Sequence, residues 1–335
     1  MSAEDLFLAC ESGNLSLVQK LLKEGADAAF QDDGGVSPLM VAAKGGQGEI
    51  VSELLMAGAP WNALDKNGMC AGEHALQNEH ADVANQILDA GVRAELILGT
   101  VERRLGRPAD LAAESMSNEE YLQQNLQFSS GGDKIIDESG EAVMMDWEAP
   151  LMEAHAQAIT SPDAHVLNVG FGLGLVDAAI QRRNPKSHTI IEAHPDVYKK
   201  MVALGWGEKP GVRIVHGRWQ DVISDLGPFD GIFFDTYGEY YPDLRKFHQE
   251  LPSLLGPGGI YSFFNGLAPD NPFFHAVYCQ IVELEMRALG FETTFVPLPI
   301  DASKKEIWKG VKNRYWWNDT YFLPVCQSLE IEEGG

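Results

Sequence analysis

Residues 165–174 read His-Val-Leu-Asn-Val-Gly-Phe-Gly-Leu-Gly, and they set the architecture of the second half of the chain. The first five residues form a short apolar run, which predicts a buried strand. Three glycines at alternate positions follow directly, and residues 175–183 have the pattern of a helix. Glycines at such a junction let the backbone approach a ligand and leave N–H groups available at the helix start. The stretch therefore predicts a strand, a ligand-binding turn and a helix.

The same alternation continues beyond this unit. Further strands are predicted at 189–192, 212–217, 229–235 and 260–264, with a helix at 196–204. Strands alternating with helices are typical of an α/β fold with a doubly wound, mostly parallel sheet, which binds ligands at the carboxyl ends of its strands. Glu192 ends the second strand, where a carboxylate can accept two hydrogen bonds from a ribose diol.

Glycines in a Gly-x-Gly-x-Gly turn would also suit a nicotinamide enzyme. Here they stand in series with Glu192, with Gly-Arg-Trp-Gln-Asp at 217–221 and with Leu-Gly-Pro-Gly-Gly at 255–259. This series resembles the Rossmann-like domain of class I methyltransferases, and the resemblance implies S-adenosylmethionine as the cofactor. It also implies that Trp219 packs on the adenine and that Asp221 lies near the adenine amino group. The residues implied in cofactor binding are Gly170, Phe171, Gly172, Gly174, Glu192, Ala193, Gly217, Trp219, Gln220 and Asp235.

The first hundred residues repeat every 33 positions. Gly25, Gly58 and Gly91 share this spacing, and the apolar pairs at 21–22, 54–55 and 87–88 fall in register. A period of 33 is an ankyrin signature, so an all-α module of about three repeats is expected over residues 1–105. The three glycines are predicted to end the second helix of each repeat. The module either holds a partner protein or only packs on an apolar face of the second domain.

The third repeat departs from the pattern of the second. Residues 70–74 read Cys-Ala-Gly-Glu-His where the second repeat has Ser-Pro-Leu at 37–39, so the third is expected to be a degenerate cap. A helical linker is predicted at 106–127, broken by Gly-Arg-Pro at 106–108. Short strands are predicted at 127–128, 134–137 and 142–144, and the second domain is expected to span 128–330.

Four stretches of sequence narrow the class of molecule that could accept the methyl group. Residues 143–152, 169–172, 234–237 and 313–317 resemble motifs of guanidinoacetate methyltransferase. Ankyrin repeats ahead of such a domain resemble the type IV protein arginine methyltransferases, which modify the δ-nitrogen of arginine. The resemblance implies that Glu148 and Asp235 bind the substrate guanidinium and are the catalytic residues. The residues expected around the substrate are Glu148, Trp147, Met152, Tyr237 and Asn265.

The chemistry of a guanidinium suits this pair of carboxylates. A guanidinium carries five donors in a flat fork and stays charged at any working pH. Two carboxylates can hold it bidentately and align one nitrogen with the donor methyl. Asp235, expected beside the donor, is the better candidate to accept the proton, and Glu148 would mainly orient the group.

Two other functions remain open. The first is methylation of a small guanidino compound, although Asn-Gly-Leu-Ala-Pro at 265–269 departs from the corresponding stretch of the guanidinoacetate enzymes. The second is an ankyrin scaffold with an inactive donor fold, against which the intact motif residues argue.

Composition excludes several classes of protein. Asp and Glu number 49 against 25 Lys and Arg, a net charge of −24, which disfavours direct nucleic-acid binding and fits an arginine-bearing protein substrate. The four cysteines are scattered, so neither a disulfide framework nor a metal site is expected. The N-terminus is not that of a secretory signal and no run is long enough to span a membrane. We expect a cytoplasmic or nuclear monomer or homodimer.

Overall fold

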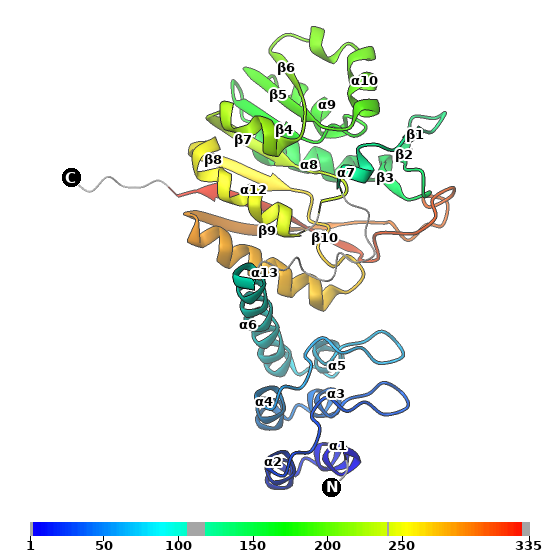
Figure 1. The fold of residues 1–335 in the computed structure, drawn as a ribbon, viewed down its shortest axis with the longest axis vertical. Helices are drawn as coiled ribbons and strands as arrows, with labels where there is room; N and C mark the ends of the chain where they lie inside the picture. Colours follow the sequence, from blue (N-terminus) through cyan, green and yellow to red (C-terminus); the bar gives the residue numbers. More distant parts are fainter. Residues whose placement is uncertain (1–2, 106–117, 240, 330–335) are drawn as a thin grey trace, which may run out of the picture. The chain divides into compact units, whose positions relative to one another are not determined.

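The computed structural model describes residues 3–105, 118–239 and 241–329, and the chain divides into two compact units (Figure 1). Unit 1 comprises Met1–Asp110 and Asn271–Ile281, and unit 2 comprises Leu111–Asp270 and Val282–Gly335. Part of the predicted helical linker, residues 106–117, lies outside the described residues. No helix among the described residues is long and apolar enough to cross a membrane.

Unit 1 is all-helical, and its helices form three successive pairs, as the 33-residue period predicts (Figure 1). Side chains one repeat apart join the pairs: Gln19 donates to Glu53 at 2.8 Å, and Gln86 donates to the carbonyl of Gly48 at 3.2 Å. The pairs are α1 (Ala3–Glu11) with α2 (Leu15–Lys23), α3 (Pro38–Lys44) with α4 (Gly48–Met56), and α5 (Ala71–Gln77) with α6 (Ala81–Leu105).

The glycines at the ends of the repeats differ in their roles. Gly25 and Gly58 follow α2 and α4 with φ values of 87° and 86°, as predicted for residues after a helix end. The prediction for Gly91 is wrong, because α6 continues through it to Leu105. A Cβ at Gly91 would lie 2.9 Å from the ring of Trp61, so this glycine admits a neighbouring indole rather than ending a helix.

The unusual start of the third repeat also has a packing reason. Ser37 caps α3 by accepting from the N–H of Met40 at 3.2 Å, whereas at Cys70 the backbone N–H donates to Glu73 at 2.9 Å. A Cβ at Gly72 would lie 2.1 Å from the ring of Phe273, which belongs to the same unit. The departure in sequence therefore makes room for an aromatic ring.

Unit 2 contains a seven-stranded sheet and a small three-stranded one (Figure 1). The large sheet has the order β6-β5-β4-β7-β8-β10-β9, and its first five strands run parallel. Strand β10 is antiparallel to both of its neighbours, β8 and β9, so β9 runs in the same direction as the first five. The strands of the large sheet are β4 (His165–Val169), β5 (Ser187–Glu192), β6 (Val212–His216), β7 (Phe229–Phe234), β8 (Leu255–Phe263), β9 (Phe291–Pro299) and β10 (Thr320–Ser328). The small antiparallel sheet contains β1 (Gln127–Phe128), β2 (Lys134–Ile136) and β3 (Ala142–Met145).

Successive residues of a strand point to opposite faces of the sheet, and here apolar residues occupy both faces. Helices therefore cover both faces of the large sheet. Val166 packs with Ile180 on one face, and Leu167 packs in a second core that contains Phe247. The helices of unit 2 are α7 (Asn118–Tyr121), α8 (Ala149–Ile159), α9 (Leu175–Gln181), α10 (Pro195–Ala203), α11 (Trp219–Val222) and α12 (Tyr241–Leu254), with short 3-10 turns η2 (Asp146–Glu148), η3 (Trp206–Glu208) and η4 (Ile223–Asp225). Helix α13 (Pro272–Ala288) begins in unit 1 and ends in unit 2. The predicted doubly wound α/β fold is confirmed.

Candidate functional site

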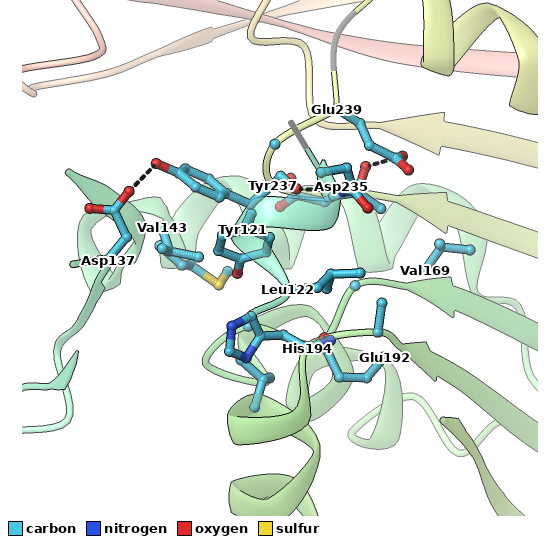
Figure 2. A pocket seen from close by; sticks show the side chains of 18 of the residues that line it. Tyr121, Leu122, Asp137, Val143, Val169, Glu192, His194, Asp235, Tyr237 and Glu239 are labelled. Carbon is cyan, nitrogen blue, oxygen red and sulfur yellow. Dashed lines mark hydrogen bonds between the residues drawn. The ribbon is translucent and has the colours of Figure 1, made fainter. Parts of the chain in front are cut away.

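A cavity of about 780 Å³ lies at one edge of the seven-stranded sheet. Val169 ends β4, Glu192 ends β5, and Asp235 directly follows β7. These strands run parallel, so their carboxyl ends meet at this edge and their last residues line the cavity (Figure 2). The cavity therefore lies where open α/β sheets bind their ligands.

The glycine turn after β4 forms a cradle of bare backbone. Gly170 and Gly172 have φ values of 97° and 54°, which favour glycine. A Cβ at Gly170 would lie 1.8 Å from the carbonyl oxygen of Asp235, and one at Gly172 would lie 2.3 Å from Sδ of Met144. Both glycines line the cavity, so their lack of a side chain keeps its wall open to a ligand.

Glu192 is buried at the cavity wall and is held by the backbone. Its Oε2 accepts from the N–H of Phe171 at 2.9 Å, and its Oε1 accepts from the N–H of His194 at 2.6 Å. Burial raises the pKa of Glu192 to about 7, against the opposing effect of these backbone donors. Each carboxylate oxygen has two lone pairs, so both oxygens can still accept from a ligand.

Glu239 joins two sides of the cavity. Its carboxylate accepts from Trp219 Nε1 at 2.9 Å, from Gln220 Nε2 at 2.7 Å and from Thr236 Oγ1 at 2.8 Å. Trp219 lines the cavity and also packs in the core, with its ring 5.2 Å from that of Phe247. The loop after β7 is thus tied to the residues that follow β6.

Glu148 and Asp235 face the same cavity from different parts of the fold. Glu148 ends the 3-10 turn η2 before α8, and Asp235 follows β7. Burial raises the pKa of Glu148 to about 8, and the nearby charge of Asp235 adds to this rise. Burial likewise raises the pKa of Asp235 to about 7. Buried Glu148 and half-buried Asp235 share this part of the cavity, and two neighbouring carboxyl groups suit a positively charged ligand.

Aromatic rings and a carboxylate surround the loop after β7 (Figure 2). The hydroxyl of Tyr237 donates to Asp137 at 3.2 Å, and the ring of Tyr237 lies 4.8 Å from that of Tyr121. Tyr121 in turn lies 4.9 Å from the ring of His194. The segment around α7 thereby reaches the loop after β7 and the loop after β5.

The structure brings ten of the predicted site residues to the cavity wall. These are Gly170, Gly172, Glu192, Ala193, Gly217, Trp219, Gln220, Asp235, Glu148 and Tyr237. Five others do not line it: Phe171, Gly174, Trp147, Met152 and Asn265.

Each of these five residues packs or forms hydrogen bonds elsewhere in unit 2. Phe171 packs against Trp206 with ring centres 5.3 Å apart, and Gly174 is the N-cap residue that precedes α9. Met152 lies on α8 and is buried in the core. The Nδ2 of Asn265 donates to the carbonyl of Phe322 at 2.9 Å. Trp147 donates to Tyr315 behind the cavity wall at 3.0 Å. Asp221, expected near the adenine, is exposed and does not line the cavity.

Sequence reasoning missed several residues that line the cavity, namely Tyr121, Asp137, His194, Glu239 and Tyr315. Glu239 could have been found, because it follows Asp235 by four residues in the Asp-Thr-Tyr-Gly-Glu run. Tyr315 belongs to an aromatic group near the C-terminus, with Trp316, Trp317, Tyr321 and Phe322, whose composition favours packing in a core. In the structure Trp316 and Tyr321 are fully buried, Trp317 is 56% exposed, and Tyr315 reaches the cavity.

Comparison with known proteins identifies two families within the chain. The family described as guanidinoacetate N-methyltransferase matches residues 114–296, and the family of ankyrin repeats in three copies matches residues 6–96. Three curated relatives all carry the name "Protein arginine N-methyltransferase 2". The relative from Cryptococcus neoformans is 36% identical and covers 96% of this chain and 94% of its own.

The other two relatives are also fungal. The one from Aspergillus oryzae is 36% identical over 81% of this chain and 75% of its own, and the one from Saccharomyces cerevisiae is 32% identical over 79% and 74%. The chain joins ankyrin repeats to a guanidinoacetate-methyltransferase-like domain and belongs to the protein arginine N-methyltransferase 2 family.

Proposed function

We propose that this protein transfers a methyl group from S-adenosylmethionine to the internal δ-nitrogen of an arginine side chain in a protein substrate. The observation that carries the proposal is a pair of carboxyl groups, buried Glu148 and half-buried Asp235, in the cavity at the sheet edge. Membership of a family whose relatives are named protein arginine N-methyltransferases supports the same acceptor.

The residues present fit the methyl donor. Gly170 and Gly172 leave a cradle that a Cβ would fill, and bare backbone there suits the amino-acid end of the donor. Glu192 keeps lone pairs available for the ribose diol, and Trp219 with Gln220 would border the adenine. When bound, the donor supplies an electrophilic methyl group on a sulfonium.

The two carboxylates would act on the acceptor. A bound guanidinium places its positive charge between Glu148 and Asp235, which lowers the pKa of both and keeps both ionised. Transfer of the methyl group would form a carbon–nitrogen bond and break the carbon–sulfur bond of the donor, and Asp235 would accept the proton that the nitrogen loses and release it to solvent. Glu148 would hold the guanidinium plane so that one nitrogen points at the methyl group.

A protein substrate fits the chain better than a small one. Ankyrin stacks present an extended concave surface that suits a partner chain, and we propose that the repeats hold part of the substrate. A net charge of −24 favours a substrate with basic residues around the target arginine.

A free guanidino acid is the second candidate, because one matching family is named for guanidinoacetate. Such a substrate needs a cation for its carboxylate, and Lys312 and Arg218 line the cavity. Lys312 already pairs with Glu141 at 3.3 Å, and Arg218 pairs with Glu119 at 3.7 Å. Both cations are therefore engaged by carboxylates of the protein.

Tandem mass spectrometry tests the proposal. The protein is incubated with a basic-protein extract, or separately with guanidinoacetate, in the presence of isotopically labelled S-adenosylmethionine. We expect labelled monomethyl-arginine whose fragments place the methyl on the internal nitrogen. Label on a terminal nitrogen would overturn the δ assignment and keep the arginine acceptor. Turnover of guanidinoacetate with no labelled protein would favour the second candidate.

A further inference from the structure

A chain of hydrogen bonds reaches Glu148 from the segment that precedes β10. Trp147 Nε1 donates to the hydroxyl of Tyr315 at 3.0 Å, and this hydroxyl donates to Oε1 of Glu148 at 2.5 Å. The backbone N–H of Met145 donates to the same Oε1 at 3.0 Å. Tyr315 and Glu148 both line the cavity, so the chain ends at the proposed acceptor site.

The direction of this chain is fixed by chemistry. An indole N–H can only donate, so the Tyr315 oxygen must accept from Trp147. The single proton of the phenol is then left for Glu148. Within the described residues only Met145 and Tyr315 donate to Glu148, and both use Oε1. Oε2 is therefore the oxygen that remains for a ligand in the cavity.

We propose that Tyr315, aligned by Trp147, is a positioning residue that locks the Glu148 carboxylate so that Oε2 alone meets the acceptor guanidinium. This inference rests on the proposed function, because it assigns a role toward the same acceptor. A locked carboxylate loses little freedom on binding and offers the planar guanidinium one direction of approach. The short bond to the hydroxyl also stabilises the ionised form of Glu148, which is the form that attracts a cation.

Other charges around Glu148 do not supply this stabilisation. Asp235, from the end of β7, repels the ionised form. In α8, Glu153 pairs with Arg182 and Arg183, and His155 is buried between Ser262 and Tyr321 with its pKa lowered by burial to about 3. Tyr315 itself stays protonated, because burial and the charge of Glu148 raise its pKa well above the ordinary range.

A purely structural role for Tyr315 is the competing explanation. Its ring lies 5.0 Å from that of Trp308 and 5.8 Å from that of Trp147, within an aromatic cluster. Tyr315→Phe keeps this ring and removes only the hydroxyl, and Trp147→Phe removes the donor that orients it. Tyr241→Phe is the matched control, because it removes a hydroxyl that donates to the carboxylate of Glu285 at 2.8 Å and does not line the cavity.

The test measures kcat/KM for an arginine peptide across pH 6 to 9.5, and donor affinity by calorimetry. We expect Tyr315→Phe to lower kcat/KM at pH 7 by about 10- to 100-fold, the range for a hydrogen bond to a charged group. Loss of this bond raises the pKa of Glu148, so the acid limb of the pH profile of kcat/KM should move to higher pH. The difference in kcat/KM between Tyr315→Phe and the wild type should therefore become smaller at pH 9.5. Trp147→Phe should show a smaller shift in the same direction, and donor affinity should stay within twofold.

An unshifted acid limb with kcat/KM within twofold of the wild type would overturn the inference, as would a loss of donor affinity equal to the loss of activity. A second measurement separates this inference from the proposed function. Calorimetry follows the binding of methylguanidine to the wild type and to Tyr315→Phe with S-adenosylhomocysteine present. If the wild type methylates no arginine yet Tyr315→Phe weakens methylguanidine binding tenfold or more, the proposed function fails and the positioning role stands. Equal binding by both proteins contradicts the positioning role.

Discussion

The proposed donor side and the proposed acceptor side of the cavity are built in different ways. On the donor side, the Gly170 turn and Glu192 come from two neighbouring strands, and backbone N–H groups hold the carboxylate. On the proposed acceptor side, Glu148, Asp235 and Tyr315 come from three distant segments, and Glu148 accepts from the Tyr315 hydroxyl as well as from the backbone N–H of Met145. The difference predicts that donor binding is sensitive to shape, whereas acceptor binding is sensitive to charge and protonation.

The largest expected effect is on the acceptor side. Asp235→Asn keeps the size of the side chain and removes the proposed proton acceptor, so kcat should fall by about 1,000-fold, within the range for general base catalysis. Donor affinity should change less than fivefold, because the carbonyl of Asp235 and the glycine cradle remain. Single-turnover rates measure the effect on methyl transfer, and calorimetry measures the effect on donor affinity. Equal losses in rate and donor affinity would contradict the division between the two sides.

On the donor side, Gly170→Ala should weaken donor binding by roughly 100-fold, because the added methyl meets the Asp235 carbonyl 1.8 Å away. Gly290→Ala is the matched control, since its φ of 88° is similar and nothing lies within 4 Å of the added Cβ. The control should lose about 1 to 2 kcal/mol of unfolding free energy and bind the donor normally. If both variants bind the donor equally, donor binding does not require the absence of a side chain at Gly170.

Protonation should affect the stability of the acceptor side. The pKa of Glu148 rises from an ordinary 4.5 to about 8 in the folded protein. A raised pKa means that the stabilisation from the protonated group is complete below pH 4.5 and is lost as pH rises through 8. Glu148→Gln should therefore raise the unfolding free energy of the ligand-free protein at pH 8.5 by about 2 kcal/mol, and much less at pH 5. Urea denaturation at the two pH values measures this difference, and an equal change at both would contradict it.

The smallest expected effect concerns the loop after β7. Tyr237→Phe removes the hydroxyl that donates to Asp137 at 3.2 Å while keeping the ring against Tyr121. The KM for an arginine peptide should rise about threefold, as expected for one modest neutral-donor bond. Donor affinity should not change. A change confined to donor affinity would place this loop on the donor side instead.

Much of the fold could be predicted because its signals are local. The apolar run at 165–169, the alternating glycines and the carboxylate at Glu192 lie within 28 residues. Gly170, Gly172 and Glu192 line the cavity, so this part of its wall could be located from a short stretch of sequence, and its assignment to the methyl donor stays a prediction. The ankyrin module followed from a period of 33, although the period alone predicted a helix end at Gly91 that the structure does not have.

The acceptor side was predicted only in part. Motif resemblance pointed to Glu148 and Asp235, which share the cavity, but it also pointed to Trp147 and Asn265, which do not line it. Neighbours in sequence such as Trp147 and Glu148 point to different surroundings, so a motif cannot tell which side chain faces a ligand.

The sequence by itself determined the order of the two modules, the sheet with its glycine turn and the family of the chain, because hydrophobic period and backbone freedom are properties of contiguous residues. The tertiary structure alone decided that Gly91 admits the ring of Trp61, that Gly72 admits the ring of Phe273, and that the hydroxyl of Tyr315 meets a carboxylate 167 positions away. Those contacts depend on which distant segments the folded chain brings within a few ångströms, and no local pattern of residues encodes that proximity.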